Sequence, residues 1–225
     1  MLYLTSMSAR RLRDLAPGRD FLGMMTTPRV RYRVFPDIRW AADNACGPGR
    51  GGAIAPNYPG DERWHSWLMR HASGPELPSC MFAVVPDVVG DADATLRRFR
   101  VLSQRVRSLG YPVALAAQNG LRSSEVPWDE ISVLFIGGDT AWKLGRDAAD
   151  LCLEARERGL FVHFGRVNSE KRIRHAIAVG ATSADGTYLK ADPHKNLPRL
   201  EGWFARMPKR QPPHVQFGLP LEAAS

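Results

Sequence analysis

Short apolar segments alternate with amphipathic segments along most of this chain, and this alternation limits its fold more than any other feature. From residue 80 onward, the apolar segments lie at 81–86, 113–118, 131–136, 160–164 and 182–189. The intervening segments at 91–109, 141–158 and 169–179 have the apolar period of helices. Gly110, Gly159 and Gly180 follow them as helix stop signals. Strands that alternate with helices through short turns pair in parallel.

The first 80 residues repeat this pattern more weakly. Apolar segments near residues 3, 23 and 41 bring the predicted strands to eight. Further helices are predicted at 8–15, 63–71 and 197–206. Eight such units predict a compact (β/α)8 barrel of the TIM type, an α/β fold, as one domain over residues 1–207. The alternative is a doubly wound open sheet.

Two segments fall outside this pattern. Residues 46–62 are rich in Gly and Pro and are expected to form a loop longer than most connections in a compact domain. Residues 208–225 are rich in Pro and are expected to form a C-terminal tail.

Polar residues follow most of the predicted strands. They are Asp43 and Asn44, Asp87, Gln118, Gly137 and Gly138, His163 with Arg166, and Asp185. Active residues of (β/α)8 barrels lie at the C-terminal ends of the strands, so these side chains are expected to meet on one face. Each of them alone also suits an ordinary turn or helix cap.

Charge and cysteine content give weaker indications. The formal net charge is +8, and Arg supplies 26 of the 31 basic residues. Arginine forks bind phosphate well, which favours a nucleic-acid partner, although codon usage in a GC-rich genome also explains the excess. Three cysteines without zinc-site spacing suit the reducing cytoplasm. Polar residues follow the short apolar start at once, so neither a signal peptide nor a membrane span is expected.

Six stretches in this order and spacing resemble the tRNA-guanine transglycosylase superfamily over roughly residues 38–204. The stretches are WAADNAC at 40–46, VPDVVGD at 85–91, AQNG at 117–120, FIGG at 135–138, VHFGRVNS at 162–169 and ADGTYL at 184–189. They are most similar to the compact branch of bacteria and phages, which is linked to 7-deazaguanine modification of DNA.

The resemblance implies a pentosyltransferase that exchanges a base on an intact polynucleotide. Asp185 would attack C1′ of the sugar and form a covalent glycosyl-enzyme, and Asp43 would transfer protons to and from the bases. Asp87, Gln118 and the backbone of Gly137–Gly138 would recognise the 7-deazaguanine edge.

Other residues are given secondary roles. Asn44 and His163 are counted with the substrate-binding residues, and a core position hydrogen-bonded within the protein is the alternative for His163. Arg166 is expected to bind a phosphate or to steady the Asp185 carboxylate. Basic side chains near the strand ends are candidates for contacts with the polynucleotide backbone, or else form solvated surface: Lys143, Lys190, Lys195 and Arg199.

The chain also departs from the tRNA enzymes. It lacks their Cys/Cys/Cys/His zinc module, so neither a metal nor another cofactor is expected, and DNA is favoured over tRNA. The same reaction on tRNA stays open, as does a barrel glycoside or nucleoside hydrolase or a base-binding module. An accessory DNA-opening protein and an oligomeric state also stay open.

Overall fold

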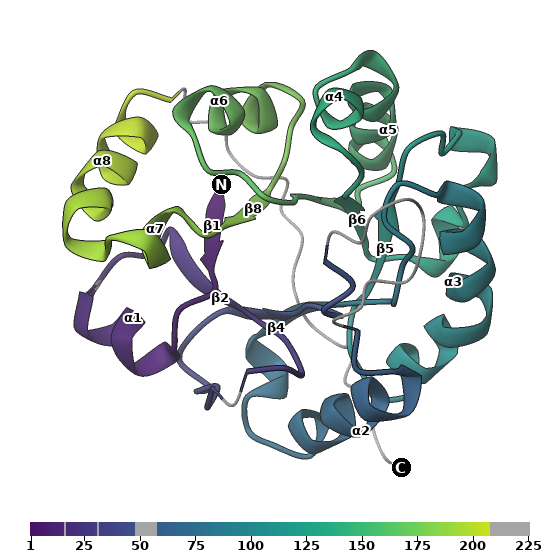
Figure 1. Cartoon of the computed structure of the whole chain (residues 1–225), viewed down its shortest axis with the longest axis horizontal. Helices are drawn as coiled ribbons and strands as arrows, with labels where there is room; N and C mark the ends of the chain where they lie inside the picture. The colour runs from purple at the N-terminus through teal and green to yellow at the C-terminus, as the bar shows by residue number, and fades with distance from the viewer. Residues whose placement is uncertain (16, 31, 48–57, 208–225) are drawn as a thin grey trace, which may run out of the picture.

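Eight parallel strands form a closed barrel in chain order, and helices surround it (Figure 1). This computed structural model describes residues 1–15, 17–30, 32–47 and 58–207. The strands are β1 (Leu2–Thr5), β2 (Leu22–Thr26), β3 (Trp40–Ala42), β4 (Cys80–Val84), β5 (Val113–Ala117), β6 (Val133–Ile136), β7 (Phe161–Phe164) and β8 (Ser183–Gly186). Because β1 pairs with β8 as well as with β2, the sheet has no free edge. The predicted (β/α)8 barrel is confirmed.

The surrounding helices do not form a complete ring. They are α1 (Ala9–Leu15), α2 (Asp61–Ala72), α3 (Ala92–Arg107), α4 (Thr140–Lys143), α5 (Arg146–Glu157), α6 (Glu170–Ala178), α7 (Tyr188–Ala191) and α8 (Pro193–Ala205). Within the described part of the chain, no α-helix lies between β2 and β3, and only two 3-10 turns lie between β5 and β6. The barrel wall is therefore less covered next to β2 and β3.

Two predicted elements are wrong in their extent. The helix expected over 141–158 is interrupted at Leu144 and Gly145, because Asp139 caps α4 and Gly145 begins a new helix as the N-cap of α5. The strand expected over 182–189 ends at Gly186. Beyond it, the backbone N–H groups of Thr187 and Tyr188 both donate to Asn168 Oδ1, which turns the chain into α7.

The alternation of side chains along the strands brings polar groups to the barrel mouth. Ala41 and Ala116 belong to the apolar cluster inside the barrel. Successive side chains of a strand point to opposite faces, so the residues two positions further along, Asp43 and Gln118, face the same interior at its C-terminal end. Apolar side chains fill the barrel interior along the strands, and the polar residues lie beyond them at the C-terminal ends of the strands.

Parts of the sequence prediction lie outside the described residues. Of the predicted loop at 46–62, residues 48–57 lie outside them and residues 61–62 belong to α2; the predicted tail at 208–225 also lies outside.

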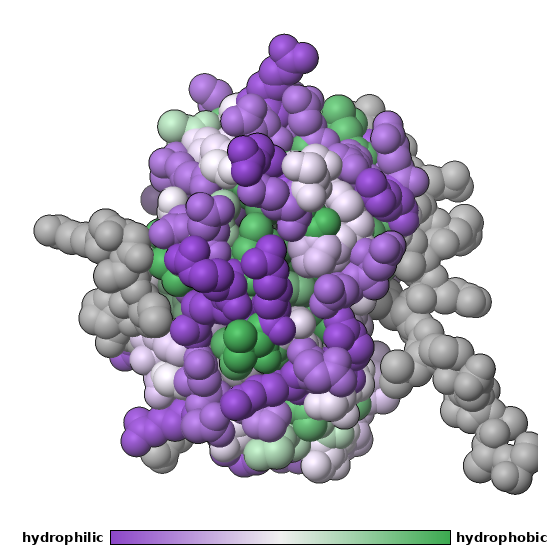
Figure 2. Space-filling model, turned by 90° about the vertical axis from the view of Figure 1, so that its right-hand side faces the viewer, coloured by the Kyte–Doolittle hydropathy of each residue, from purple (hydrophilic) through white to green (hydrophobic). Residues whose placement is uncertain are grey.

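The side of the molecule that carries α3 and α5 is largely hydrophilic, with small separate hydrophobic spots (Figure 2). Among the described residues, no helix is long and apolar enough to cross a membrane.

Candidate active site

A cavity of about 100 Å³ opens at the C-terminal end of the barrel. Its wall contains all the predicted site residues except His163: Asp43, Asn44, Asp87, Gln118, Gly137, Gly138, Arg166 and Asp185. The remaining lining residues are mostly apolar, and sequence reasoning did not assign Met25, Val84 and Phe135 to the site. A buried water needs roughly 10–15 Å³ of such space, so the cavity has room for a group of several heavy atoms.

Asp185 is held by one of its two carboxylate oxygens. Its Oδ1 lies 3.1 Å from Nε2 of His163 and accepts a hydrogen bond of 3.2 Å from the backbone N–H of Arg166. Arg166 has a φ of 58°, a left-handed conformation that is uncommon outside glycine and turns this N–H toward Asp185. From the described residues, Oδ2 accepts no hydrogen bond. Asp185 therefore presents one anchored oxygen and one available oxygen at the cavity.

His163 lies beside Asp185 and is not among the residues that line the cavity, which agrees with the alternative prediction of a core position hydrogen-bonded within the protein. Its side chain is fully buried, and its ring lies 4.7 Å from the ring of Phe135 and 5.0 Å from that of Phe82. Nδ1 lies 2.8 Å from Ser183 Oγ. A proton on Nε2 allows the ring to donate to Asp185, and the Ser183 hydroxyl, which is both a donor and an acceptor, is a partner for Nδ1.

Asp87 is the centre of a buried polar network. Its Oδ1 accepts from Asn44 Nδ2 at 2.8 Å, and its Oδ2 accepts from Gln118 Nε2 at 2.6 Å. Burial raises the pKa of Asp87 to about 6, although the Asn44 hydrogen bond opposes the increase. Carboxylate oxygens accept more than one hydrogen bond, so Asp87 can still receive N–H donors from a ligand.

The side-chain amides of Asn44 and Gln118 form hydrogen bonds within the protein, including those to Asp87. Asn44 also donates to the carbonyl of Val85 at 3.0 Å, and its Oδ1 accepts from the backbone N–H of Cys46 at 2.7 Å. Gln118 Oε1 accepts from the backbone N–H groups of Gly90 and Gly138. The amide of Asn44 is thus used within the protein, which leaves it little capacity for the predicted contact with substrate.

The glycine pair is required by local packing. A Cβ on Gly137 would lie 2.5 Å from Gln118 Nε2, and one on Gly138 would lie 2.6 Å from a ring carbon of Trp142. The Gly137 N–H donates to Ala117 O, and the Gly138 N–H donates to Gln118 Oε1. These two donors are therefore occupied, and direct recognition of a base by this backbone is limited to its carbonyl groups.

A Gly138→Ala variant tests this packing. Gly138 has a φ of +66°, and Gly120, with a φ of +84°, has no heavy atom within 4 Å of a Cβ position. Both substitutions incur backbone strain of about 1 kcal/mol, and only Gly138→Ala adds the clash with Trp142. We expect Gly138→Ala to lower the free energy of unfolding by about 1–2 kcal/mol more than Gly120→Ala in urea denaturation. Equal losses would show that Gly138 is not packed against Trp142.

Asp43 has an electrostatic environment suited to proton transfer. It is partly exposed to the cavity, and burial raises its pKa to about 7, with further increases from the negative charges of Asp185 and Asp87. Backbone N–H groups of Asn44 and Ala45 hold the carboxylate and oppose the increase. A carboxyl group with a pKa near neutrality can donate and accept a proton at working pH.

This raised pKa predicts a stability effect that depends on pH. The pKa of Asp43 is about 7 in the folded protein, against an ordinary value of 3.8 for an exposed aspartate, so folding becomes less favourable as pH rises from about 4 to about 7. An Asp43→Asn variant removes this penalty. We expect the free energy of unfolding to increase by roughly 2–4 kcal/mol at pH 8 and by less at pH 5. Asp129→Asn, at an exposed aspartate, is the control. Destabilisation of Asp43→Asn at pH 8 would contradict the raised pKa.

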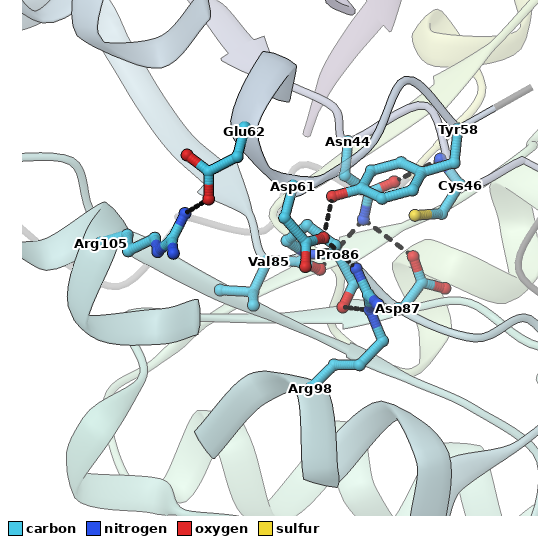
Figure 3. A network of polar contacts seen from close by, with 10 residues as sticks. All are labelled: Asn44, Cys46, Tyr58, Asp61, Glu62, Val85, Pro86, Asp87, Arg98 and Arg105. Carbon is cyan, nitrogen blue, oxygen red and sulfur yellow. Dashed lines mark hydrogen bonds and ion pairs between the residues drawn. The ribbon is translucent and has the colours of Figure 1, made fainter. Parts of the chain in front are cut away.

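A network of polar contacts, which sequence reasoning missed, supports the loop that carries Asp87 (Figure 3). Arg98 of α3 donates from Nε to the carbonyl of Pro86 at 3.2 Å and forms an ion pair with Asp61. Its guanidinium lies 5.2 Å from the ring centre of Tyr58, whose hydroxyl also donates to Asp61. Arg98 lies in the second turn of α3, the helix that follows β4. Its position near the start of this helix is the one feature of the sequence that places it close to the barrel mouth. It connects the residue before Asp87 to the start of α2.

Two basic side chains, Lys143 and Arg166, lie on the side of the cavity formed by the segments after β6 and β7. Lys143 was expected near the substrate backbone, but it is buried, and its Nζ donates to the carbonyl of Gly165 at 2.7 Å. Burial lowers its pKa to about 8, and the nearby charge of Arg166 adds to this. The guanidinium of Arg166 donates to the carbonyl of Gly138. These contacts join the loops after β6 and β7 behind Asp185.

In the described part of the chain, no group of three or more His, Cys, Asp or Glu residues is arranged to hold a metal ion.

Two solved structures have a distant similarity to this chain. No family model matches this chain, and no curated protein matches it. The Bacillus subtilis YkuI protein, which has an EAL domain and was solved in complex with substrate c-di-GMP and calcium, is 12% identical to this chain. The match has a TM-score of 0.40 and covers 76% of this chain and 44% of YkuI. A mandelate racemase/muconate lactonizing enzyme-like protein from Rubrobacter xylanophilus is 16% identical to this chain. The match has a TM-score of 0.34 and covers 69% of this chain and 47% of that protein. The chain spans less than half the length of each, and neither similarity bears on activity.

Proposed function

We propose that this protein is an enzyme, a base-exchanging pentosyltransferase that replaces guanine in a polynucleotide with a 7-deazaguanine. The observation that carries the proposal is the environment of Asp185. One of its oxygens is fixed by His163 and Arg166, the other accepts no hydrogen bond from the described residues, and Asp43 and Asp87 line the same small cavity. The resemblance in sequence to tRNA-guanine transglycosylases agrees with this arrangement.

The first step breaks the bond between guanine and its sugar. Oδ2 of Asp185 attacks C1′ as the bond from C1′ to N9 of guanine breaks, and the electron pair of that bond leaves with the base. Protonated Asp43 gives the departing guanine its proton. The developing positive charge on the sugar is stabilised by the carboxylate, as in retaining glycosidases.

The second step restores the carboxylate. N9 of the incoming 7-deazaguanine attacks C1′, the bond from C1′ to Asp185 breaks, and its electron pair returns to the carboxylate. Ionised Asp43 accepts the proton that N9 loses. One residue thus serves as acid and then as base, which requires a pKa near the working pH.

Base recognition falls mainly to Asp87. A guanine-like edge presents adjacent N–H donors, and Asp87 offers a buried acceptor whose direction is fixed by Asn44 and Gln118. A site that hydrogen-bonds a ligand in this way rejects analogues that leave its polar groups unpaired by about 10⁴-fold. Adenine, which carries a different donor pattern, is therefore excluded.

Label transfer tests the proposal. The protein is incubated with a radiolabelled 7-deazaguanine and, in separate reactions, with DNA or tRNA. We expect label in DNA of unchanged chain length. Label in tRNA alone would assign the same chemistry to RNA. Release of free guanine without label uptake would instead indicate a nucleoside hydrolase.

A further inference from the structure

A second cavity, distinct from the candidate active site, lies on the outside of the barrel beside α2. It has a volume of about 550 Å³, and it lies between α2 and the connection from β2 to β3, where the described chain has no helix to cover the barrel wall. We call it the α2 groove. Its lining residues are Pro28, Arg29, Pro59, Glu62, Arg63, Ser66, Trp67 and Arg70.

The charge of the α2 groove is positive. Arg63 and Arg70 are seven residues apart on one face of α2, roughly 10 Å along its axis, and both are exposed. Neither forms an ion pair with an acid in the described parts of the chain. The one acidic lining residue, Glu62, is bonded to Arg105 at 2.7 Å. The groove therefore presents arginine forks whose charge is not neutralised locally.

The α2 groove lies close to the mouth of the barrel. The backbone N–H of Asp43 donates to the carbonyl of Thr26 at 2.8 Å, and Pro28 follows Thr26 by two residues. Two residues span at most about 7 Å, so the groove begins within about 10 Å of the backbone of the candidate acid–base residue. Met25, which precedes Thr26 at the end of β2, lines the cavity of the candidate active site, called the catalytic cavity below. The α2 groove and the catalytic cavity therefore lie next to each other at this edge of the barrel.

From these observations we infer that the α2 groove binds the sugar–phosphate backbone of the polynucleotide beside the exchanged base. This inference rests on the proposed function. Arginine suits phosphate because its planar fork forms paired, charge-assisted hydrogen bonds. Such contacts position a strand without reading its sequence, so Arg63 and Arg70 raise affinity for any polynucleotide and leave base selection to the catalytic cavity.

Binding measurements with an Arg63→Ala/Arg70→Ala double variant test the inference. The probe is a fluorescent single-stranded DNA oligonucleotide, titrated at several salt concentrations. We expect an affinity loss on the order of tenfold, and a salt dependence less steep by about 0.7 per arginine removed. The matched control, Arg97→Ala/Arg100→Ala, removes two exposed arginines of α3 and is expected to change the affinity by less than about twofold. Binding of the free 7-deazaguanine base stays unchanged in both.

The outcomes separate this inference from the proposed function. Equal losses in the two double variants, or an unchanged salt slope, would overturn the role of the α2 groove even if base exchange occurs. A loss confined to the groove variant supports it even if no base is exchanged. Displacement of the oligonucleotide by poly-glutamate at lower charge concentration than by unlabelled DNA would point to an acidic protein partner and overturn the inference.

Discussion

An Asp185→Asn variant is expected to form no covalent complex with a polynucleotide and to lose base exchange by roughly 10⁴-fold or more. The amide cannot supply the attacking oxygen anion. It can still accept hydrogen bonds from His163 and the Arg166 backbone through Oδ1, so the local structure is expected to persist. The measurement is the formation of a protein–oligonucleotide complex that survives denaturing electrophoresis.

Two controls separate loss of chemistry from loss of structure. The variant should melt within a few degrees of the wild type and should bind the free deazaguanine, because Asp87 and Gln118 are unchanged. A Ser183→Ala variant removes the contact to His163 Nδ1 and leaves the carboxylate of Asp185 in place. It should retain the covalent complex at a reduced rate. A covalent complex at wild-type level with Asp185→Asn would reject this residue as the nucleophile.

An Asp43→Asn variant is expected to slow base exchange by about 10²–10⁴-fold and to remove its dependence on pH near neutrality. The pKa of Asp43 is about 7, so the fraction that can donate a proton falls above this pH. In the wild type, formation of the covalent complex should therefore decrease about tenfold per pH unit above pH 7. In the variant, the slow residual rate should not change between pH 6 and pH 9.

The stability measurement on the same variant makes this test specific. Asp43→Asn is expected to be more stable than the wild type at pH 8 while it is much less active. Low activity with lower stability would indicate a damaged fold. A wild-type pH profile retained in Asp43→Asn would assign the proton transfer to another group.

Much of the candidate site followed from the sequence because strand geometry is regular. Parallel strands of a barrel end on one face, and the alternation of side chains fixes which residues reach the interior there. This reasoning brought Asp43, Gln118 and Asp185 together although they are far apart in the chain. The eight strands were predicted to within two or three residues for the same reason.

What the sequence could not predict depends on side-chain partners. Nothing in the pattern shows that the amide of Asn44 is used within the protein, or that His163 lies behind Asp185. Arg98 was missed because its contacts cross from α3 to a loop 12 residues earlier and to Asp61, 37 residues earlier. The break between α4 and α5 was missed because the apolar period continues across it, while the N-cap at Gly145 is a local backbone feature.

The most direct test of the account is to locate the covalent bond. The wild-type protein is incubated with a guanine-containing DNA oligonucleotide without an incoming base, quenched with acid, digested and analysed by mass spectrometry. The account predicts a sugar adduct on the peptide that contains Asp185, joined to DNA of unbroken backbone that has lost one guanine. An adduct on Asp43 or Asp87, or guanine loss with no adduct on any aspartate under these conditions, would contradict it.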